Sequence, residues 1–229
     1  MIEVKALYQK FEDNVILHNI SLKIVEGDFL AVIGHNGSGK TTLIKHLNGL
    51  LLPSKGKVIV DNLDTKKSSV EIKKKVGMIF QNPEDQLVYS IVEEDIAFGL
   101  ENLGLPPAQI RDKVDAILKQ LHISKLAKEN VNNLSFGQKQ LVALAGILVM
   151  EPKYVVFDEP TTVLDPVNRE NLFKVMQQVN RRGATVILVT NNLGDLKFVK
   201  RVIVLNKGKK IFDGAKPSKR TLEKADIYA

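Results

Sequence analysis

The chain has 229 residues, no cysteine, and 33 Lys and Arg against 26 Asp and Glu, which gives a formal net charge of +7. This length suits one large domain or two small ones, and the lack of cysteine excludes a disulfide-stabilised fold. The positive charge is compatible with a solvated basic surface, with binding to nucleic acid, or with binding to an anionic membrane face. Neither a signal peptide nor a membrane span is expected, because no basic start precedes an apolar run and the longest apolar stretch, 141–150, is too short for a bilayer.

The predicted elements, in chain order, mix strands with helices. Alternating apolar residues or continuous apolar runs predict strands at 2–8, 16–25, 29–34, 57–61, 76–80, 154–158, 184–190 and 201–206. Helical spacing of apolar residues predicts helices at 40–51, 106–121 and 135–150, and a further helix that begins at Asp165. An α/β core is therefore interrupted by a helical insert over about 82–150.

The stretch GHNGSGKTT at 34–42 is a glycine-rich loop between a buried strand and a helix. It satisfies the pattern G-x-x-x-x-G-K-[ST], in which backbone N–H groups and a helix N-terminus bind phosphates. Lys40 is expected to reach the β- and γ-phosphates, and Thr41 to ligate Mg²⁺. The alternative is a glycine-rich turn that binds nothing. The buried strand before the loop, the Lys-Thr pair and the helix after it together favour phosphate binding over such a turn. The residues predicted to bind ATP here are Gly34, Asn36, Gly37, Ser38, Gly39, Lys40, Thr41 and Thr42.

Two acids stand at the end of the predicted strand at 154–158. Asp158 can hold Mg²⁺ through its hydration shell, and Glu159 can polarise a water for in-line attack on the γ-phosphate. Taken alone, Asp-Glu-Pro after a strand is equally compatible with a polar exit into a turn. Beside a phosphate loop, the functional interpretation is favoured.

The segment NLSFGQKQ at 133–140 begins a predicted helix, and Ser135 and Gln138 have the spacing of a capping box. Within it, LSFGQ resembles the LSGGQ signature of ATP-binding-cassette (ABC) ATPases. The order of motifs is also similar to that family: the phosphate loop, Gln81 after a strand, LSFGQ, YVVFDEP, and TTVLDP with Asp165. The resemblance covers nearly the whole chain.

This resemblance implies an α/β fold: a P-loop NTPase (RecA-like) core with an antiparallel β subdomain and an inserted α-helical subdomain. It makes residues 1–229 a single ABC ATPase domain, with core and β subdomain in 1–81 and 151–215, the helical subdomain in 82–150, and a short tail in 216–229. No C-terminal regulatory domain is expected, so dimerisation should depend on ATP and on a membrane partner.

The resemblance also implies a mechanism in which two such domains pair head to tail and enclose two ATP molecules. Each ATP lies between the phosphate loop of one domain and the signature helix of the other. The signature residues expected to contact ATP are Ser135, Gly137 and Gln138. Phe136 departs from the family's glycine, and we expect it to be tolerated. Gln81 would ligate Mg²⁺ and sense the membrane partner, and Asp165 would organise the dimer interface.

The family stacks an aromatic residue on the adenine ring. Phe11, expected on the loop between the first two strands, is the candidate in this chain. Tyr8 is its rival, and a plain core role is equally compatible with either residue. The cofactors predicted from all these motifs are ATP and Mg²⁺.

The stretch QNPEDQLVYSIVEEDIAFGLENLGLPP at 81–107 narrows the resemblance to energy-coupling factor (ECF) transporter ATPases. ECF transporters import vitamins or transition-metal ions, and two ATPase subunits drive a membrane coupling protein bound to a substrate-capturing protein. The resemblance implies a peripheral protein at the cytoplasmic face of the cell membrane, in a homodimer or heterodimer with a second ABC ATPase, without nucleic acid. The helix after Gln81 would line the groove for the coupling protein.

Asn191 and Asn192 follow the predicted strand at 184–190, where the family usually has a histidine, often followed by Asp. That histidine hydrogen-bonds the γ-phosphate and helps to position the attacking water. An asparagine amide can donate a hydrogen bond but cannot carry a proton, and the loss of a matched donor can cost about 10²–10³ in rate. Because Glu159 is present, binding of ATP and Mg²⁺ should survive while hydrolysis weakens.

Three explanations of Asn191 remain open. The chain is half of a heterodimer whose partner has a complete site, or Asn191 suffices, or the asparagine was introduced to trap ATP. The leading function is the ATPase subunit of an ECF-type importer. Alternatives are the ATPase of another ABC transporter, a non-transport ABC protein of DNA repair or translation, and a nucleotide-gated subunit with little hydrolysis of its own.

Overall fold

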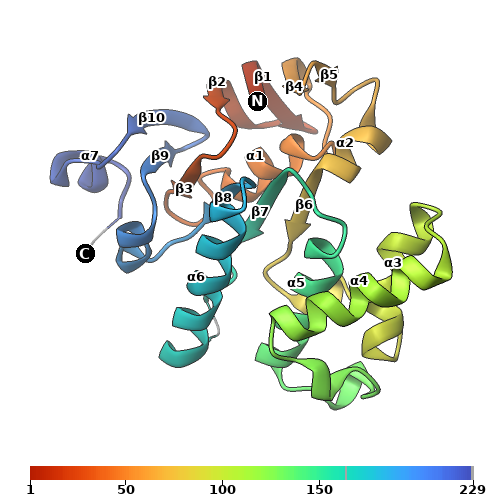
Figure 1. Ribbon diagram of the computed structural model, residues 1–229. Helices are drawn as coiled ribbons and strands as arrows, with labels where there is room; N and C mark the ends of the chain where they lie inside the picture. Colours follow the sequence, from red (N-terminus) through yellow and green to blue (C-terminus); the bar gives the residue numbers. More distant parts are fainter. Residues whose placement is uncertain (163, 228–229) are drawn as a thin grey trace.

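A computed structural model describes residues 1–162 and 164–227 (Figure 1). Residue 163, within the TTVLDP motif, and residues 228–229, at the end of the predicted tail, lie outside the described residues. The strands are β1 (Ile2–Phe11), β2 (Asn14–Ile24), β3 (Phe29–Ile33), β4 (Lys55–Val60), β5 (Leu63–Asp64), β6 (Val76–Ile79), β7 (Tyr154–Asp158), β8 (Thr185–Val189), β9 (Arg201–Asn206) and β10 (Lys209–Gly214). The α-helices are α1 (Lys40–Leu47), α2 (Ser69–Lys75), α3 (Val92–Asn102), α4 (Pro107–Gln120), α5 (Phe136–Leu148), α6 (Pro166–Arg181) and α7 (Lys219–Lys224).

The larger sheet has six strands in the order β10-β9-β3-β8-β7-β6. The strands from β9 to β6 run parallel, and β10 is antiparallel to β9 at the edge. Every residue of β3, β7 and β8 is buried, as expected for strands that are covered on both faces. Because β8 lies between β3 and β7, the loops that leave the carboxyl ends of these three strands are neighbours, although the sequence separates them widely.

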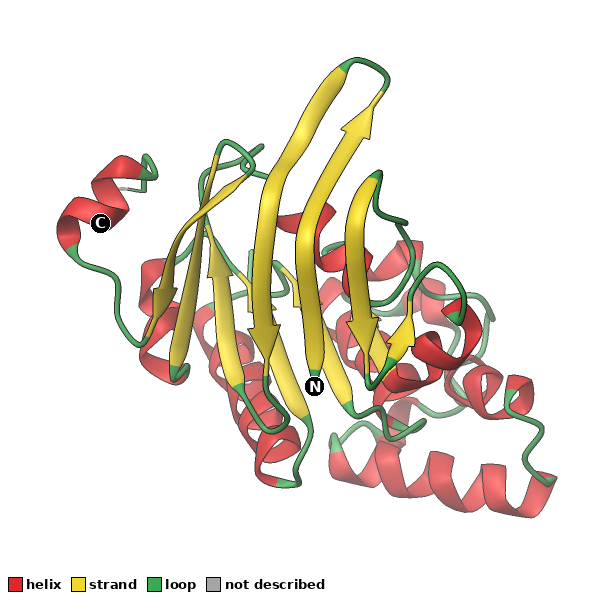
Figure 2. Ribbon diagram, turned by 90° about the horizontal axis from the view of Figure 1, so that it is seen from above, coloured by secondary structure: helices red, strands yellow, loops and turns green. Residues whose placement is uncertain are grey.

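The smaller sheet is antiparallel, in the order β2-β1-β4-β5. In the view from above, its long strands lie in front of the rest of the molecule (Figure 2). Its inner face shares one hydrophobic core with α1 and with β3 and β8 of the larger sheet. The strand β1 is longer than predicted, and Phe11 pairs with Asn14 in a tight hairpin. Phe11 therefore ends β1 rather than lying in the loop, because only two residues, Glu12 and Asp13, connect the strands.

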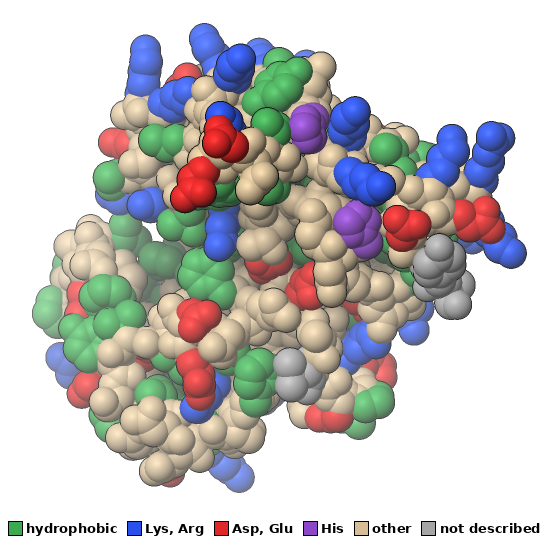
Figure 3. Space-filling view, turned by 180° about the vertical axis from the view of Figure 1, so that it is seen from behind, with side chains coloured by type: hydrophobic (Ala, Val, Ile, Leu, Met, Phe, Trp, Pro, Cys, Tyr) green, Lys and Arg blue, Asp and Glu red, His purple; other side chains and the backbone are tan. Residues whose placement is uncertain are grey.

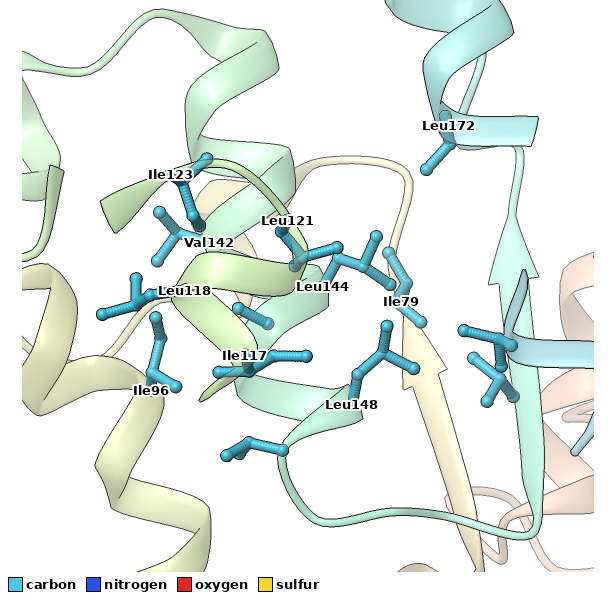
Figure 4. Close-up of a cluster of buried hydrophobic side chains, with 14 of the residues drawn as sticks. Ile79, Ile96, Ile117, Leu118, Leu121, Ile123, Val142, Leu144, Leu148 and Leu172 are labelled. Carbon is cyan, nitrogen blue, oxygen red and sulfur yellow. The ribbon is translucent and has the colours of Figure 1, made fainter. Parts of the chain in front are cut away.

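The helices α3, α4 and α5 form the part of the molecule at the lower right of Figure 1. Figure 4 shows their packing: Ile117 and Leu118 of α4 lie with Leu144 and Leu148 of α5 in one apolar cluster. Ile79 of β6 belongs to the same cluster, so the helical insert shares its core with the larger sheet. The position of the insert is thus tied to the sheet that carries the strand-end loops.

Some element ends differ from the predictions. The helix predicted at 40–51 ends at Leu47, because Gly49 adopts a left-handed conformation with φ of 73°. Ser135 caps α5 from outside the helix, and the predicted tail contains α7. Among the described residues, no helix has both the length and the apolar character that a membrane crossing requires.

Candidate active site

The glycine-rich loop joins β3 to α1 and is shaped by close backbone contacts. Gly39, directly before α1, has a φ of 99°, which side chains with a Cβ rarely adopt. At Gly34 a Cβ atom would lie 2.4 Å from Ser38 Oγ and 2.5 Å from the Leu205 carbonyl oxygen. Ser38 Oγ is buried and has no hydrogen-bond partner among the described residues. The loop thus has the tight curvature and the free polar atom that a phosphate cradle needs.

Lys40 places a buried ammonium group beneath this loop. Its Nζ donates to the carbonyl oxygens of Gly34, at 3.0 Å, and His35, at 3.2 Å, and lies 3.5 Å from Glu159 Oε1. Burial lowers the pKa of Lys40, and the negative charges of Glu159 and Asp158 oppose that effect. The cation is therefore held where a phosphate oxygen can reach it.

Asp158 and Glu159 stand at the carboxyl end of β7. Asp158 is 6% exposed and accepts a hydrogen bond from Thr41 Oγ1 at 3.1 Å. Burial raises the pKa of Asp158, and the Thr41 hydrogen bond opposes that effect. Glu159 has a φ of 48°, a left-handed conformation that costs a non-glycine residue about 1–3 kcal/mol. Its backbone N–H donates to the Val189 carbonyl at 3.0 Å, so β8 holds the strained residue in place.

Asn191 follows β8 and connects the acid with the phosphate loop. Its Nδ2 donates to Glu159 Oε1 at 2.9 Å and to Asn36 Oδ1 at 2.8 Å. The two N–H groups of the amide are matched to these two acceptors. Sequence reasoning placed Asn191 at the site, but it did not foresee that the amide would bridge the two loops.

A hollow of about 500 Å³ brings most of the predicted ATP and Mg²⁺ ligands together. It is lined by Phe11, Ile16, Asn36, Gly37, Gly39, Lys40, Thr41, Thr42, Gln81 and Glu159. Phe11 is 44% exposed at this hollow, whereas Tyr8 does not line it. Ile16 is a lining residue that the sequence pattern did not reveal, because it read only as a strand residue.

The polar groups around the hollow fit Mg²⁺ and a nucleotide triphosphate. Thr41, Gln81 and Asp158 offer neutral and anionic oxygen atoms, and Mg²⁺ takes few protein ligands when phosphates and waters complete its octahedron. The unpartnered Ser38 Oγ and the buried Lys40 add a donor and a positive charge on the phosphate side. The donor set therefore matches the predicted cofactors.

The remaining predicted residues lie outside this hollow. Ser135 caps α5 in a capping box: its Oγ accepts from the Gln138 N–H at 3.4 Å, and its N–H donates to Gln138 Oε1 at 2.9 Å. Asp165 caps α6: it accepts from the backbone N–H and the side-chain amide of Asn168 and from the N–H of Val167, and these hydrogen bonds lower its pKa. In the described part of the chain, Ser135, Gly137 and Gln138 are not among the residues that line the hollow at the phosphate loop.

Sequence reasoning missed a buried carboxylate behind the site. Asp195, in a 3₁₀ helix η4 (Leu193–Phe198), is fully buried and contacts Arg169 of α6. An acid four residues after Asn191 and an arginine four residues after Asp165 were the only sequence signals, and neither spacing predicts a contact.

A groove of about 460 Å³ lies between α2, α3 and α5. Its lining is mostly apolar and includes Val70, Val88 and Phe98, with Val70 63% and Val88 64% exposed. Lys73 and Lys74 stand at its rim. Seen from behind, a recess with hydrophobic side chains separates the helical part at lower left from the upper part, which carries many Lys and Arg side chains (Figure 3).

Comparison with known proteins gives three results. The sequence matches the ABC transporter family over residues 17–162. It is 47% identical over 205 residues to an energy-coupling factor transporter ATP-binding protein EcfA1 of Clostridium perfringens, covering 88% of this chain and 73% of that protein. It is 45% identical over 218 residues to a cobalt import ATP-binding protein CbiO of Syntrophus aciditrophicus, covering 93% of this chain and 78% of that protein.

The fold is likewise similar to a solved ATP-binding subunit. The structure of cbiO1 from Clostridium perfringens, described as part of the ABC transporter complex cbiONQ, superposes with a TM-score of 0.86 and 35% identity. The match covers 93% of this chain and 88% of that one. The predicted fold class, an α/β P-loop core with an antiparallel sheet and inserted helices, is thereby confirmed.

Proposed function

Since the chain belongs to the ABC transporter family and is an ABC-type ATPase, we propose that it powers an importer of the energy-coupling factor type. The named relatives that support this proposal are an energy-coupling factor ATP-binding protein and a cobalt import ATP-binding protein. A vitamin or a transition-metal ion is the proposed cargo, and a membrane capture protein would select it. The observation that carries the proposal is that Lys40 and Glu159 line one hollow, 3.5 Å apart, and that Asn191 donates a hydrogen bond to Glu159.

The site residues divide the chemistry between them. The phosphate loop, with Lys40, binds the β- and γ-phosphates, and Phe11 stacks on the adenine. Thr41, Asp158 and Gln81 would hold Mg²⁺, which neutralises charge on the phosphates. Glu159 accepts a proton from the attacking water, which lies in line with the bond to the leaving ADP.

Asn191 serves as the positioning donor of this site. Its amide holds Glu159 Oε1 at 2.9 Å and Asn36 at 2.8 Å, so the base and the phosphate loop keep a fixed separation. Of the three explanations for the missing histidine, this geometry favours the one in which asparagine suffices. The amide supplies orientation without a titratable group, and the proton is taken by Glu159.

The complete site needs a second ATPase chain. Ser135, Gly137 and Gln138 lie outside the hollow, on and around the N-terminus of α5, where the N–H groups favour an anion. A head-to-tail partner would bring its own α5 N-terminus to the γ-phosphate, and Asp165 at the N-terminus of α6 would contact that partner. The partner is a second copy or a related ATPase.

The groove between α2, α3 and α5 is the proposed docking site for the membrane coupling protein. Its exposed valines and apolar floor suit a helix of that protein. Gln81 lines the hollow, η1 (Pro83–Asp85) begins two residues later, and Gln86 lines the groove, so the segment between hollow and groove is short. In this proposal the chain is a peripheral subunit at the cytoplasmic face of the membrane, with the groove turned toward the coupling protein.

Co-purification with membrane proteins tests the transport role. We expect the chain, expressed in its host with an affinity tag, to retain hydrophobic membrane proteins after detergent extraction. Val88→Asp should reduce that retention at least tenfold, whereas Val25→Asp, which changes a 55% exposed valine outside the groove, should not. Retention on nucleic acid at physiological salt, without membrane proteins, would contradict the proposal.

A further inference from the structure

Asp195 is a fully buried carboxylate that four donors saturate. Arg169 donates to Oδ1 from Nε at 3.0 Å and from an Nη at 2.5 Å. The hydroxyl groups of Thr190, at 2.6 Å, and Thr161, at 3.3 Å, donate to Oδ2. A carboxylate has about four acceptor positions, so no acceptor position of Asp195 is left over.

The four donors come from three segments that carry proposed functional residues. Thr190 precedes Asn191, and its oxygen also accepts the N–H of Asn192 at 3.0 Å, which fixes the backbone around Asn191. Thr161 lies two residues after Glu159. Arg169 lies in the first turns of α6, four residues after the cap. Asp195 is therefore the point where the loops after β7 and β8 are joined to α6.

We propose that Asp195 and Arg169 form a positioning pair for hydrolysis, which sets the separation of Glu159 and Asn191 and links it to the orientation of α6. The inference rests on the proposed roles of those two residues. A displacement of the N-terminus of α6 would move Arg169 and, through its hydrogen bonds to Oδ1, the Asp195 carboxylate. Because Thr161 and Thr190 donate to Oδ2 of the same carboxylate, the loops after β7 and β8 would be displaced with it. Neither residue of the pair is among the described residues that line the hollow.

An asparagine at position 195 cannot satisfy this set of donors. It would keep one oxygen and present an NH₂ group on the other side. Toward Arg169 the NH₂ would face a group that only donates, and toward the threonines it would require both hydroxyl groups to accept instead of donate, opposite an Arg169 that has lost its charged partner. The fold can retain Asp195→Asn because size and shape are preserved. The link from the two threonines through residue 195 to Arg169 would weaken, so Glu159 and Asn191 would be held less firmly to α6, and a misplacement of about 1 Å can cost about 10²-fold in rate.

The test measures hydrolysis and binding separately on the full chain. Single-turnover Mg-ATP hydrolysis, taken across protein concentrations, gives the rate, and titration with a fluorescent ATP analogue gives the dissociation constant. Asp195→Asn and Arg169→Gln should each lower the rate about 10–100-fold and leave the dissociation constant within about threefold. The hydrolysis rate of the double variant should be no lower than that of the slower single variant, because both substitutions break the same Arg169–Asp195 contact. Arg169→Lys, which keeps the charge, should recover part of the rate.

Two controls distinguish a loss of positioning from a loss of folded protein and from a wrong assignment of the general base. Glu170→Gln breaks the exposed Glu170–Lys174 pair on the same helix and should change nothing. Thermal unfolding of each variant gives the fraction of folded protein, and each hydrolysis rate is divided by that fraction. Equal rates per folded molecule in wild type, Asp195→Asn and Arg169→Gln would overturn the positioning role. If Glu159→Gln hydrolyses ATP normally, the proposed base is wrong, whatever the pair does.

Discussion

The amide of Asn191 distinguishes this site at the scale of single residues. It donates two hydrogen bonds, to Glu159 and to Asn36, and its protonation does not change at physiological pH. Positioning and proton transfer are thus assigned to different side chains. An imidazole would add a titratable group, with an ordinary pKa of about 6.5, to the same place.

Substitution of Asn191 separates these two contributions. Asn191→Ala leaves Glu159 without its 2.9 Å donor, and we expect hydrolysis to fall by about 10² while ATP binding changes little. Asn191→His restores a donor, so its rate at pH 8 should lie within about tenfold of wild type. It should also gain a pH dependence near the ordinary histidine pKa of about 6.5. Steady-state rates from pH 5.5 to 8.5 measure both effects, and an Asn191→Ala enzyme as fast as wild type would refute the role.

At the scale of elements, the N-terminus of α5 has a structural and a proposed functional task. Ser135 Oγ accepts the Gln138 N–H and completes a capping box. Ser135→Ala should therefore lower the free energy of unfolding by about 1 kcal/mol, as measured by urea denaturation, even without nucleotide. An unchanged midpoint would mean that the cap does not stabilise the helix.

The hairpin of β9 and β10 contains an acid whose charge is favoured by its neighbours. Burial alone would raise the pKa of Asp213, but hydrogen bonds from Arg201, at 2.7 and 3.0 Å, and from Lys210, at 3.0 Å, together lower it. Because the folded-state pKa lies below the unfolded one, this stabilisation is present above the unfolded value of about 3.9 and is lost as the pH falls through the folded value.

Asp213→Asn tests this account of the hairpin. The variant should be less stable than wild type by about 1 kcal/mol at pH 7, because a partly exposed ion-pair cluster contributes about that much. The difference should shrink progressively below about pH 4. Urea unfolding at pH 7 and at pH 3 compares the two proteins, and an equal difference at both pH values would contradict the assigned charge effect.

The same scale indicates what the sequence predicts and what it does not. The apolar runs at 29–34, 154–158 and 184–190 predicted buried strands, and the motifs at their ends predicted Lys40 and Glu159, because local pattern and spacing determine them. The left-handed backbone of Glu159 and the Asp195–Arg169 contact depend on which strands are neighbours. Pairing of β8 with β3 and β7 is tertiary information, so no local pattern contains it.

At the scale of the whole molecule, the proposed head-to-tail dimer divides the active site between two chains. The signature residues do not line the hollow at the phosphate loop of the described chain, and in the proposed dimer each ATP would therefore contact both partners. This division predicts complementation between two inactive variants. Lys40→Ala loses the phosphate loop function, and Gly137→Glu places a negative charge where the partner's γ-phosphate would lie.

A mixture of these variants should recover activity that neither has alone. In a mixed dimer, the intact phosphate loop of one chain faces the intact signature helix of the other, so one composite site is restored. With random pairing, half of the dimers are mixed, and we expect the mixture to reach about a quarter of the wild-type rate at equal total concentration. If light scattering detects ATP-dependent dimers in the mixture but ATPase activity does not recover, the shared site is contradicted.

The central claim is that Glu159, held by Asn191, is the base of an ATP-hydrolysing site in this chain. Single-turnover hydrolysis of Mg-ATP by wild type and by Glu159→Gln, with ATP binding measured on the same samples, tests it most directly. The account predicts that both proteins bind ATP within about threefold and that Glu159→Gln hydrolyses it at least about 10² times more slowly, the loss expected for a general base. Equal hydrolysis by the two proteins would contradict it.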